Sequence, residues 1–314
     1  MRQHPNKYLR AAVGIAKLMG FAKLGKKRTL AAVFAFSLLV ACGGDRIEPA
    51  ATPSGESKLL VVTTTALLGD LVENVGREWG DVRSLVPPGV DVHSFQTTPE
   101  DSIAINRVQV IVINGFGLDA FLRPVLESAR GGNSVQVVAA EGMSGEADPH
   151  LWQNPVFAIR YIERIRDGLA AADPEHKSQY DVNAQAYINQ LRALDLELDR
   201  ILSQVKPEFR RLITYHDAFG HLAERYGWEV SAFVASDTDE VSPKAVVQIL
   251  GRLNQQGIPA IFVGPQFSSD VIRRAAEDGG VAVAMIYSDL AENGPTSYVE
   301  MMRLNAKSLA ENLR

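Results

Sequence analysis

The longest regular pattern of apolar positions in the chain covers residues 174–205. Apolar residues follow one another there at alternating steps of four and three, which places them on one stripe of a helix, while polar residues fill much of the rest. The stripe consists of Tyr180, Ala184, Tyr187, Leu191, Leu194, Leu198, Ile201 and Val205. Asp173 and Pro174 predict the N-cap and the first helical position, and Lys206-Pro207 predicts the end. At about 1.5 Å per residue this helix would be roughly 48 Å long.

Short apolar runs alternate with amphipathic stretches on both sides of this segment. Strands are predicted over 59–64, 82–86, 108–113, 135–138, 212–215, 230–234, 260–263 and 281–286. Helices are predicted over 66–77, from 98 onward, and over 118–129, 155–172, 219–226, 242–254, 268–278 and 297–313. We therefore predict an α/β fold of two Rossmann-like lobes, 58–173 and 206–314, each with a four-stranded parallel sheet flanked by helices. One long rigid helix over 174–205 joins them, although for that helix taken alone a core or coiled-coil seam is the alternative.

The first 57 residues have the composition of a targeting segment and a tether. Residues 1–41 hold eight Lys and Arg and no acid, and an apolar run over 30–40 is too short to span a bilayer. This region resembles the bacterial lipoprotein signal, in which cleavage precedes a cysteine whose thiol carries the lipid. Cys42, the only cysteine, matches that position. We expect lipidation at Cys42, a flexible tether over 42–57, and a true start at Met19.

Charge and length restrict the class of partner. The 314 residues suggest two domains, with 46% hydrophobic and 22% charged residues as in ordinary globular protein. Beyond residue 41 there are 24 Lys and Arg against 37 Asp and Glu, a formal charge of −13. An acidic body argues against nucleic acid as a partner and is mildly favourable for small cations. We expect a monomer.

Three histidines and one aspartate follow predicted strands. His93, His150 and His216 lie in such loops, and Asp289 occupies the matching place after the last strand. Taken singly, each fits a capping or hydrogen-bonded residue. Because ligands in parallel sheets sit beyond the carboxyl ends of the strands, the four groups could instead converge between the lobes and form a tetrahedral metal site.

The motifs in both lobes resemble one family. They are the segments around the three histidines, Asn114-Gly115 with Leu118-Asp119, Asn183 to Tyr187, Ser242-Pro243-Lys244, Pro265-Gln266-Phe267 and Tyr298 to Asn305. From about residue 58 to the C-terminus the chain resembles the zinc and manganese solute-binding lipoproteins of ABC importers, the ZnuA/TroA-like group. The resemblance implies a divalent metal between two lobes, with ligands at His93, His150, His216 and Asp289. It also implies capture outside the cytoplasm, by a protein lipid-anchored at a periplasmic face or cell surface, and delivery to an ABC permease and its ATPase.

The expected ligands favour zinc as the captured ion. Three imidazoles and one carboxylate suit tetrahedral Zn²⁺, whereas Mn²⁺ prefers more oxygen donors, and members of the family built for manganese typically place a carboxylate where His216 stands. Manganese and iron remain alternatives, because the connection over 139–147 lacks the His-rich loop of many zinc-specific members. Gly264 also replaces a usual Glu. Water or another carboxylate is the alternative to Asp289.

Further residues near the ligands have predicted supporting roles. Metal-bound imidazoles usually have a hydrogen-bonding partner, and Asp91, Asp148 and Asp217 lie one or two residues from a ligand. His221 is expected to be structural, because it points away from its neighbour His216 on a helix.

Two other classes of function compete with metal capture. A metallohydrolase could use the same histidines, but the sequence has no His-Glu-x-x-His motif, no Gly-x-Ser-x-Gly elbow and no Gly-rich phosphate loop. We therefore expect no enzymatic activity. An adhesin or interaction module with acidic lobes is the other alternative.

Overall fold

The computed structural model describes residues 57–128, 133–143, 148–234, 251, 255, 257–266 and 270–314. All of them belong to one compact unit, Gly55–Arg314. The predicted leader, Cys42, the tether apart from Ser57, and most of the helix predicted over 242–254 lie outside the described residues. Among the helices of the described part, none combines the length and the apolar character that crossing a membrane requires.

The first sheet is fully parallel and packed on both faces. Its strands are β1 (Leu59–Thr63), β2 (Gly80–Ser84), β3 (Val110–Ile113) and β4 (Val135–Val138), in the order β2-β1-β3-β4. Its helices are α1 (Ala66–Gly76), α2 (Pro99–Ile105), α3 (Arg123–Ser128) and α4 (Pro155–Ala172). Alternate residues of β3 belong to different clusters: Val110 packs in the cluster of α1 and α4, and Ile111 in that of α2 and α3. Burial on both faces explains the uninterrupted apolar run of β3.

The second sheet repeats this arrangement. Its strands are β5 (Arg211–His216), β6 (Glu229–Val234), β7 (Ala260–Val263) and β8 (Ala282–Met285), all parallel and in the order β6-β5-β7-β8. Its helices in the described part are α6 (Gly220–Tyr226), α8 (Asp270–Asp278) and α9 (Tyr298–Asn312). Short 3₁₀ turns are η1 (Arg77–Trp79), η2 (Ala120–Leu122), η3 (Leu151–Gln153), η4 (Pro174–His176) and η5 (Pro207–Phe209). Two sheets of four parallel strands confirm the predicted fold class.

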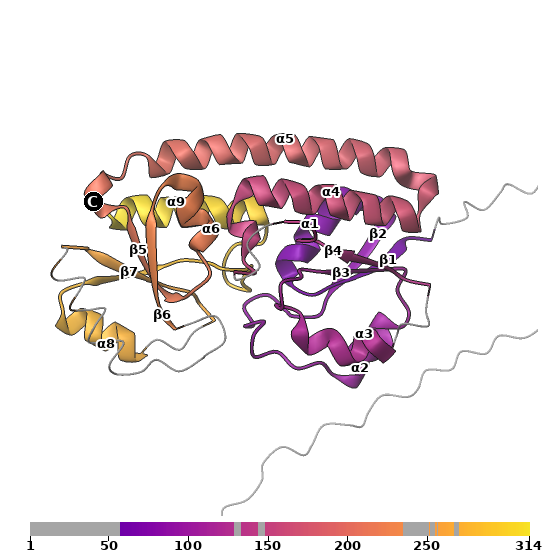
Figure 1. Ribbon diagram of the computed structural model, residues 1–314, viewed down its shortest axis with the longest axis horizontal. Coiled ribbons are helices and arrows are strands. Elements are labelled where there is room, and N and C mark those ends of the chain that lie inside the picture. Colours follow the sequence, from indigo (N-terminus) through magenta and orange to yellow (C-terminus); the bar gives the residue numbers. More distant parts are fainter. Residues whose placement is uncertain are drawn as a thin grey trace, which may run out of the picture. The chain divides into compact units, whose positions relative to one another are not determined.

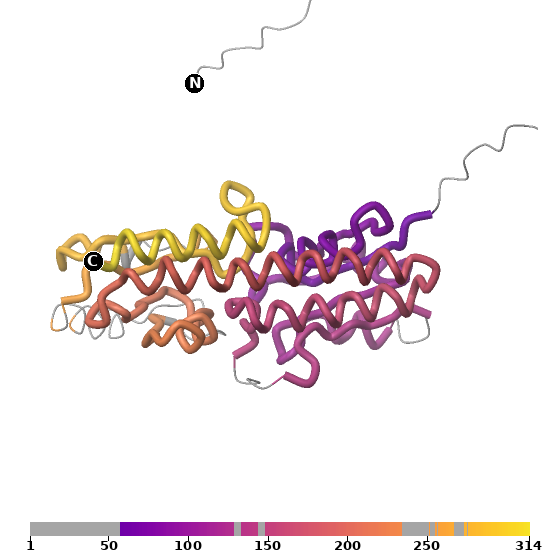
Figure 2. The backbone as a smooth tube through the Cα atoms, turned by 90° about the horizontal axis from the view of Figure 1, so that it is seen from above, coloured from indigo at the N-terminus to yellow at the C-terminus, as the bar shows by residue number. Residues whose placement is uncertain are grey.

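The predicted long helix is α5 (Lys177–Leu202), which follows η4. It packs against α4 and α1 beside the first sheet and against α9 beside the second, as Figures 1 and 2 show. Its apolar stripe is buried, and Leu191 is 0% exposed. Asp173 and Pro174 are the N-cap and the first position, as predicted, but of the 3₁₀ turn η4, and the α-helix itself begins three residues later, at Lys177. The Asp173 carboxylate accepts hydrogen bonds from His176 Nδ1 and the Tyr180 hydroxyl, both at 2.7 Å.

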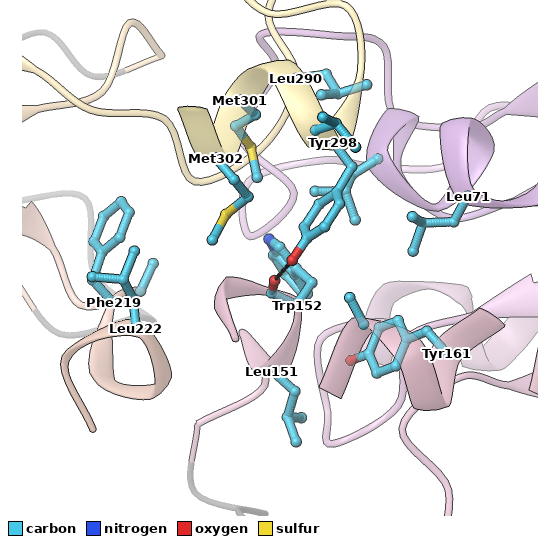
Figure 3. Packing of buried hydrophobic residues seen from close by; sticks show 14 of the residues in the cluster. Leu71, Leu151, Trp152, Tyr161, Phe219, Leu222, Leu290, Tyr298, Met301 and Met302 are labelled. Carbon is cyan, nitrogen blue, oxygen red and sulfur yellow. Dashed lines mark hydrogen bonds between the residues drawn. The ribbon is translucent and has the colours of Figure 1, made fainter. Parts of the chain in front are cut away.

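One hydrophobic cluster extends through both lobes and α5. Figure 3 shows its centre, where Tyr298 of α9 reaches η3 and its hydroxyl donates a 2.7 Å hydrogen bond to the carbonyl of Trp152. Both side chains are buried. The two sheets are therefore packed together through side chains that come from segments nearly 150 residues apart.

Candidate metal centre

The three predicted histidines come together at the carboxyl ends of the two sheets. His93 lies in the loop between β2 and α2, His150 lies after β4 and directly before η3, and His216 is the last residue of β5. Their ligating nitrogens all lie within 4.8 Å of one another. His150 and His216 are buried and His93 is half-buried. The strand order reverses beside β5, the place where parallel sheets bind ligands.

The spacing of the imidazoles fits a tetrahedral ion. The Nε2 atoms of His150 and His216 are 3.3 Å apart. Two nitrogens bound to one Zn²⁺ at about 2.0–2.1 Å in a tetrahedron are separated by about 3.4 Å. The adjoining cavity has a volume of about 20 Å³ and is lined by His93, His150, His216 and Asp289 among others. A space of that size admits one ion or one water molecule.

Asp148 determines the tautomer of His150. Its Oδ1 is 2.8 Å from His150 Nδ1 and also accepts the His150 backbone N–H at 3.0 Å. Because a carboxylate only accepts, Nδ1 must carry the proton, and the lone pair of Nε2 then faces His216. Burial raises the pKa of Asp148, but the hydrogen bond and charge of His150 outweigh it and the pKa is lowered overall. Asp148 is thus ionised and holds His150 ready to bind a metal.

His216 is neutral at any physiological pH. Burial, and to a smaller extent the neighbouring His150 and His93, together lower the pKa of its imidazole to about 3, against the opposing charge of Asp148. Only a neutral imidazole can bind a metal, so His216 is also in its binding form.

Asp289 lines the same cavity but is not part of the three-histidine group. Its Oδ1 accepts the backbone N–H of Leu290 at 2.6 Å and that of Leu67, from the first lobe, at 3.1 Å. Burial raises the pKa of Asp289 to about 6, and the two amides oppose the increase. The carboxylate is therefore ionised at neutral pH and available as an anionic ligand.

The segments that carry His150 and Asp289 are hydrogen-bonded to each other. Trp152 Nε1 and Gln153 Nε2 both donate to the carbonyl of Ser288, at 2.8 and 3.2 Å. Ser288 directly precedes Asp289, so these bonds fix the position of the loop that carries the aspartate. Sequence reasoning missed this role, although a buried Trp needs an acceptor for its N–H and Trp152 stands two residues after His150.

Asn114 belongs to the Asn114-Gly115 motif of the sequence, and in the structure its side chain contacts the residue before His150. Its Nδ2 donates to the carbonyl of Pro149 at 2.9 Å, and its Oδ1 accepts the Tyr161 hydroxyl at 2.7 Å. Asp119 accepts the backbone N–H groups of Asn114 and Gly115. The residue before His150 is therefore anchored to β3 and α4.

The remaining predicted positions have different contacts. Asp91 Oδ1 accepts the backbone N–H of His93 at 3.2 Å. Asp217 is exposed over most of its surface, and the surrounding protein, by keeping part of the water from its carboxyl group, raises the pKa of Asp217, as does the charge of Asp148. A side chain at Gly264 would meet Gln266, whose Nε2 donates to Ser288 Oγ at 2.7 Å. Gly264 therefore leaves room for a glutamine amide that also lines the cavity.

Residues 61–312 match the family model described as zinc-uptake complex component A, periplasmic. Among curated proteins, the chain is 31% identical over 267 residues to the iron-binding protein YfeA of Yersinia pestis, covering 81% of this chain and 86% of that protein. It is 27% identical over 299 residues to the manganese-binding lipoprotein MntA of Halalkalibacterium halodurans, covering 92% and 99%.

Solved structures agree with these relationships. The periplasmic zinc-binding protein TroA of Treponema pallidum has a TM-score of 0.76 against this chain at 27% identity, covering 82% of this chain and 99% of that one. A manganese-bound point mutant of the periplasmic metal-binding protein of Candidatus Liberibacter asiaticus has a TM-score of 0.74 at 25% identity, covering 82% and 100%. With these matches across both lobes, the chain belongs to the ZnuA/TroA family of metal-binding solute-binding proteins of ABC importers.

Proposed function

We propose that the protein captures Zn²⁺ between its two lobes and delivers it to the permease of an ABC importer. The observation that carries this proposal is the convergence of three imidazoles within 4.8 Å, two of them at the spacing of a tetrahedral zinc site. His93, His150 and His216 supply nitrogen ligands, and Asp289 supplies the fourth. A four-ligand shell leaves no position for a reactive water, which suits binding and release better than catalysis.

The organisation of the chain follows from this role. Residues 58–173 and 206–314 form the two metal-binding lobes, and 174–205 link them. Lipid on Cys42 and the tether over 42–57 hold the protein, as a monomer, at the outer side of a bacterial membrane. The family consists of substrate-binding proteins that work with a permease and an ATPase, not of enzymes.

Manganese is the second candidate because several relatives are named for it, among them MntA of Halalkalibacterium halodurans and PsaA of Streptococcus pneumoniae. The predominance of nitrogen donors in the histidine group is the reason for preferring zinc. A carboxylate with two available oxygens at Asp289 would suit manganese better.

The test is competitive titration of the full-length chain, purified in detergent and stripped of metal, with Zn²⁺ and Mn²⁺. We expect one tightly held Zn²⁺ that is lost in His93→Ala and in His216→Ala. His176→Ala serves as the matched control, because His176 also pairs with an aspartate, Asp173, but lies at the start of α5. Preference for Mn²⁺ would refute the zinc assignment, and the absence of any tight divalent metal would refute metal capture.

A further inference from the structure

His221, in α6 of the second lobe, contacts the first lobe. Its Nε2 is 3.1 Å from the backbone carbonyl of Asp148 and 3.7 Å from Asp148 Oδ2. Its ring meets that of Phe157, in α4, edge to face with 5.5 Å between centroids. The residue is only 7% exposed. Because a carbonyl only accepts, Nε2 carries the proton and donates a hydrogen bond to the Asp148 carbonyl.

Gly220 makes the second contact with Asp148. A Cβ atom at this position would lie 2.7 Å from Asp148 Oδ2, closer than Cβ atoms approach other non-hydrogen atoms in proteins. Only a glycine therefore allows the carboxylate to lie against the start of α6. Gly220 and His221 thus contact Asp148 at two places: the carboxylate lies against Gly220, and the main-chain carbonyl accepts the hydrogen bond of His221.

Asp148, whose main chain is bonded to His221 and whose carboxylate lies against Gly220, is the residue that orients a proposed ligand. Asp148 Oδ1 bonds His150 Nδ1 at 2.8 Å, while Oδ2 faces Gly220 and His221. The second lobe thus contacts one oxygen of a carboxylate whose other oxygen fixes the tautomer of His150 in the first lobe. If the carboxylate turned away, Nδ1–H would lose its acceptor and the preference for a metal-binding Nε2 would weaken.

We propose that Gly220 and His221 are positioning residues for His150, so that the readiness of this first-lobe ligand depends on contact with the second lobe. The inference rests on the proposed metal capture. It adds that the contact between the lobes influences the affinity for the metal, through Asp148 and His150. Separation of the lobes at this point would release Asp148 and weaken metal binding at the same time. The role differs from simple packing, because packing alone would not determine which nitrogen of His150 carries its proton.

Two variants perturb the contacts of Gly220 and His221 with Asp148 and leave no cavity in the hydrophobic core. Gly220→Ala places a methyl group against the end of a flexible side chain, which can turn aside, so the fold should persist while Asp148 moves. His221→Phe keeps a ring beside Phe157 and removes only the donor. His221→Gln is the conservative variant, since its amide can still donate to the Asp148 carbonyl, and His176→Phe is the control for loss of a remote histidine paired with an acid.

The measurements are Zn²⁺ affinity by competition and the tautomer of His150 by ¹⁵N NMR of the metal-free, full-length chain in detergent. We expect Gly220→Ala and His221→Phe to lower the affinity by about 10–100-fold, the usual effect of losing a partner of a metal ligand, and to reduce the Nδ1–H form of His150. His221→Gln and His176→Phe should stay close to the unchanged protein in both measurements.

Unchanged affinity and tautomer in both perturbing variants would overturn the inference and leave metal capture intact. A lower melting temperature accompanied by an unchanged tautomer would also overturn it, since that result describes packing only. Failure of the unchanged protein to bind any divalent metal would instead overturn the proposed function, and the inference with it.

Discussion

Removal of one buried hydroxyl, in Tyr298→Phe, tests the contact between the lobes. Tyr298 is 0% exposed and donates a 2.7 Å hydrogen bond to the Trp152 carbonyl, which lies two residues after His150. Burial raises the pKa of Tyr298 well above its ordinary value, so the hydroxyl remains a donor. Phenylalanine keeps the ring and its packing, and only the hydrogen bond is lost (Figure 3).

The loss of stability follows from the buried Trp152 carbonyl, which loses its hydrogen-bond donor. A net hydrogen bond contributes about 0.5–1.5 kcal/mol, and leaving a buried carbonyl without its donor costs about 1–3 kcal/mol. We expect the free energy of unfolding to fall by about 2 kcal/mol. At about 2–4 °C per kcal/mol for a protein of this size, the melting temperature should fall by about 4–8 °C.

The assay is urea unfolding at pH 7.5 followed by circular dichroism, with thermal melting as a second measurement. Tyr187→Phe is the matched comparison, because that ring is also buried but its hydroxyl is 3.4 Å from Asp70 Oδ2, a weak contact. Its free energy of unfolding should fall by no more than about 0.5 kcal/mol. Equal unfolding midpoints for Tyr298→Phe and the unchanged protein would refute the reasoning.

Three further predictions concern the core and two half-buried carboxyl groups. Leu191→Ala should lower the free energy of unfolding by about 2–5 kcal/mol, whereas Leu196→Ala, at a position 71% exposed, should change it by about 0.5 kcal/mol or less in the same urea assay. Burial raises the pKa of Asp289 to about 6, so a proton competes with metal below that pH. Zn²⁺ affinity should therefore fall about tenfold more between pH 7 and 5 in the unchanged protein than in Asp289→Asn, and equal slopes would exclude Asp289 as a ligand. Burial likewise raises the pKa of Asp70 from 3.8 to about 6. The folded state then holds this proton more tightly than the unfolded state, so the stability relative to Asp70→Asn should decline as pH rises from about 4 to 6; urea unfolding at several pH values would reveal a flat or rising difference if this is wrong.

Asp70 also shows how α1 is joined to the second lobe. Its Oδ2 accepts the backbone N–H of Tyr298, the first residue of α9, at 2.8 Å, and Oδ1 accepts Asn74 Nδ2 at 3.2 Å. Together with the bonds from Trp152 and Gln153 to Ser288, this contact links the two lobes. Trp152 and Ser288 also line the cavity of the three histidines, so part of the contact between the lobes lies at the candidate metal site.

Local patterns in the sequence were sufficient for the elements and their order. The four-three stripe predicted α5 within a few residues at each end, and the apolar run at 108–113 predicted a buried parallel strand, which the structure has at Val110–Ile113. Thr98-Pro99 with Asp101 predicted the start of α2, where the structure has a capping box. Such features depend on side chains only a few positions apart, so periodicity and capping chemistry record them directly.

The sequence also placed the three histidines after strands, and strand ends of parallel sheets share one edge. It did not determine which acid partners which imidazole, since Asp91, Asp148 and Asp217 all lie within two residues of one of the histidines. Only the folded backbone and the chosen rotamers brought Asp148 to His150 Nδ1 while Asp91 bonded a backbone amide.

Contacts between the lobes were decided by tertiary structure alone. The residues near His221 in the sequence do not indicate its bond to Asp148, 73 positions away. The residues near Trp152 likewise do not indicate that its acceptor is the Ser288 carbonyl, 136 positions away. The sequence by itself determined the strands, the helices and the residue types at the candidate metal centre, because these follow from neighbours along the chain. The pairing of donors with acceptors across the lobes depends on how two separately formed sheets pack on α5, and that packing is a property of the whole fold.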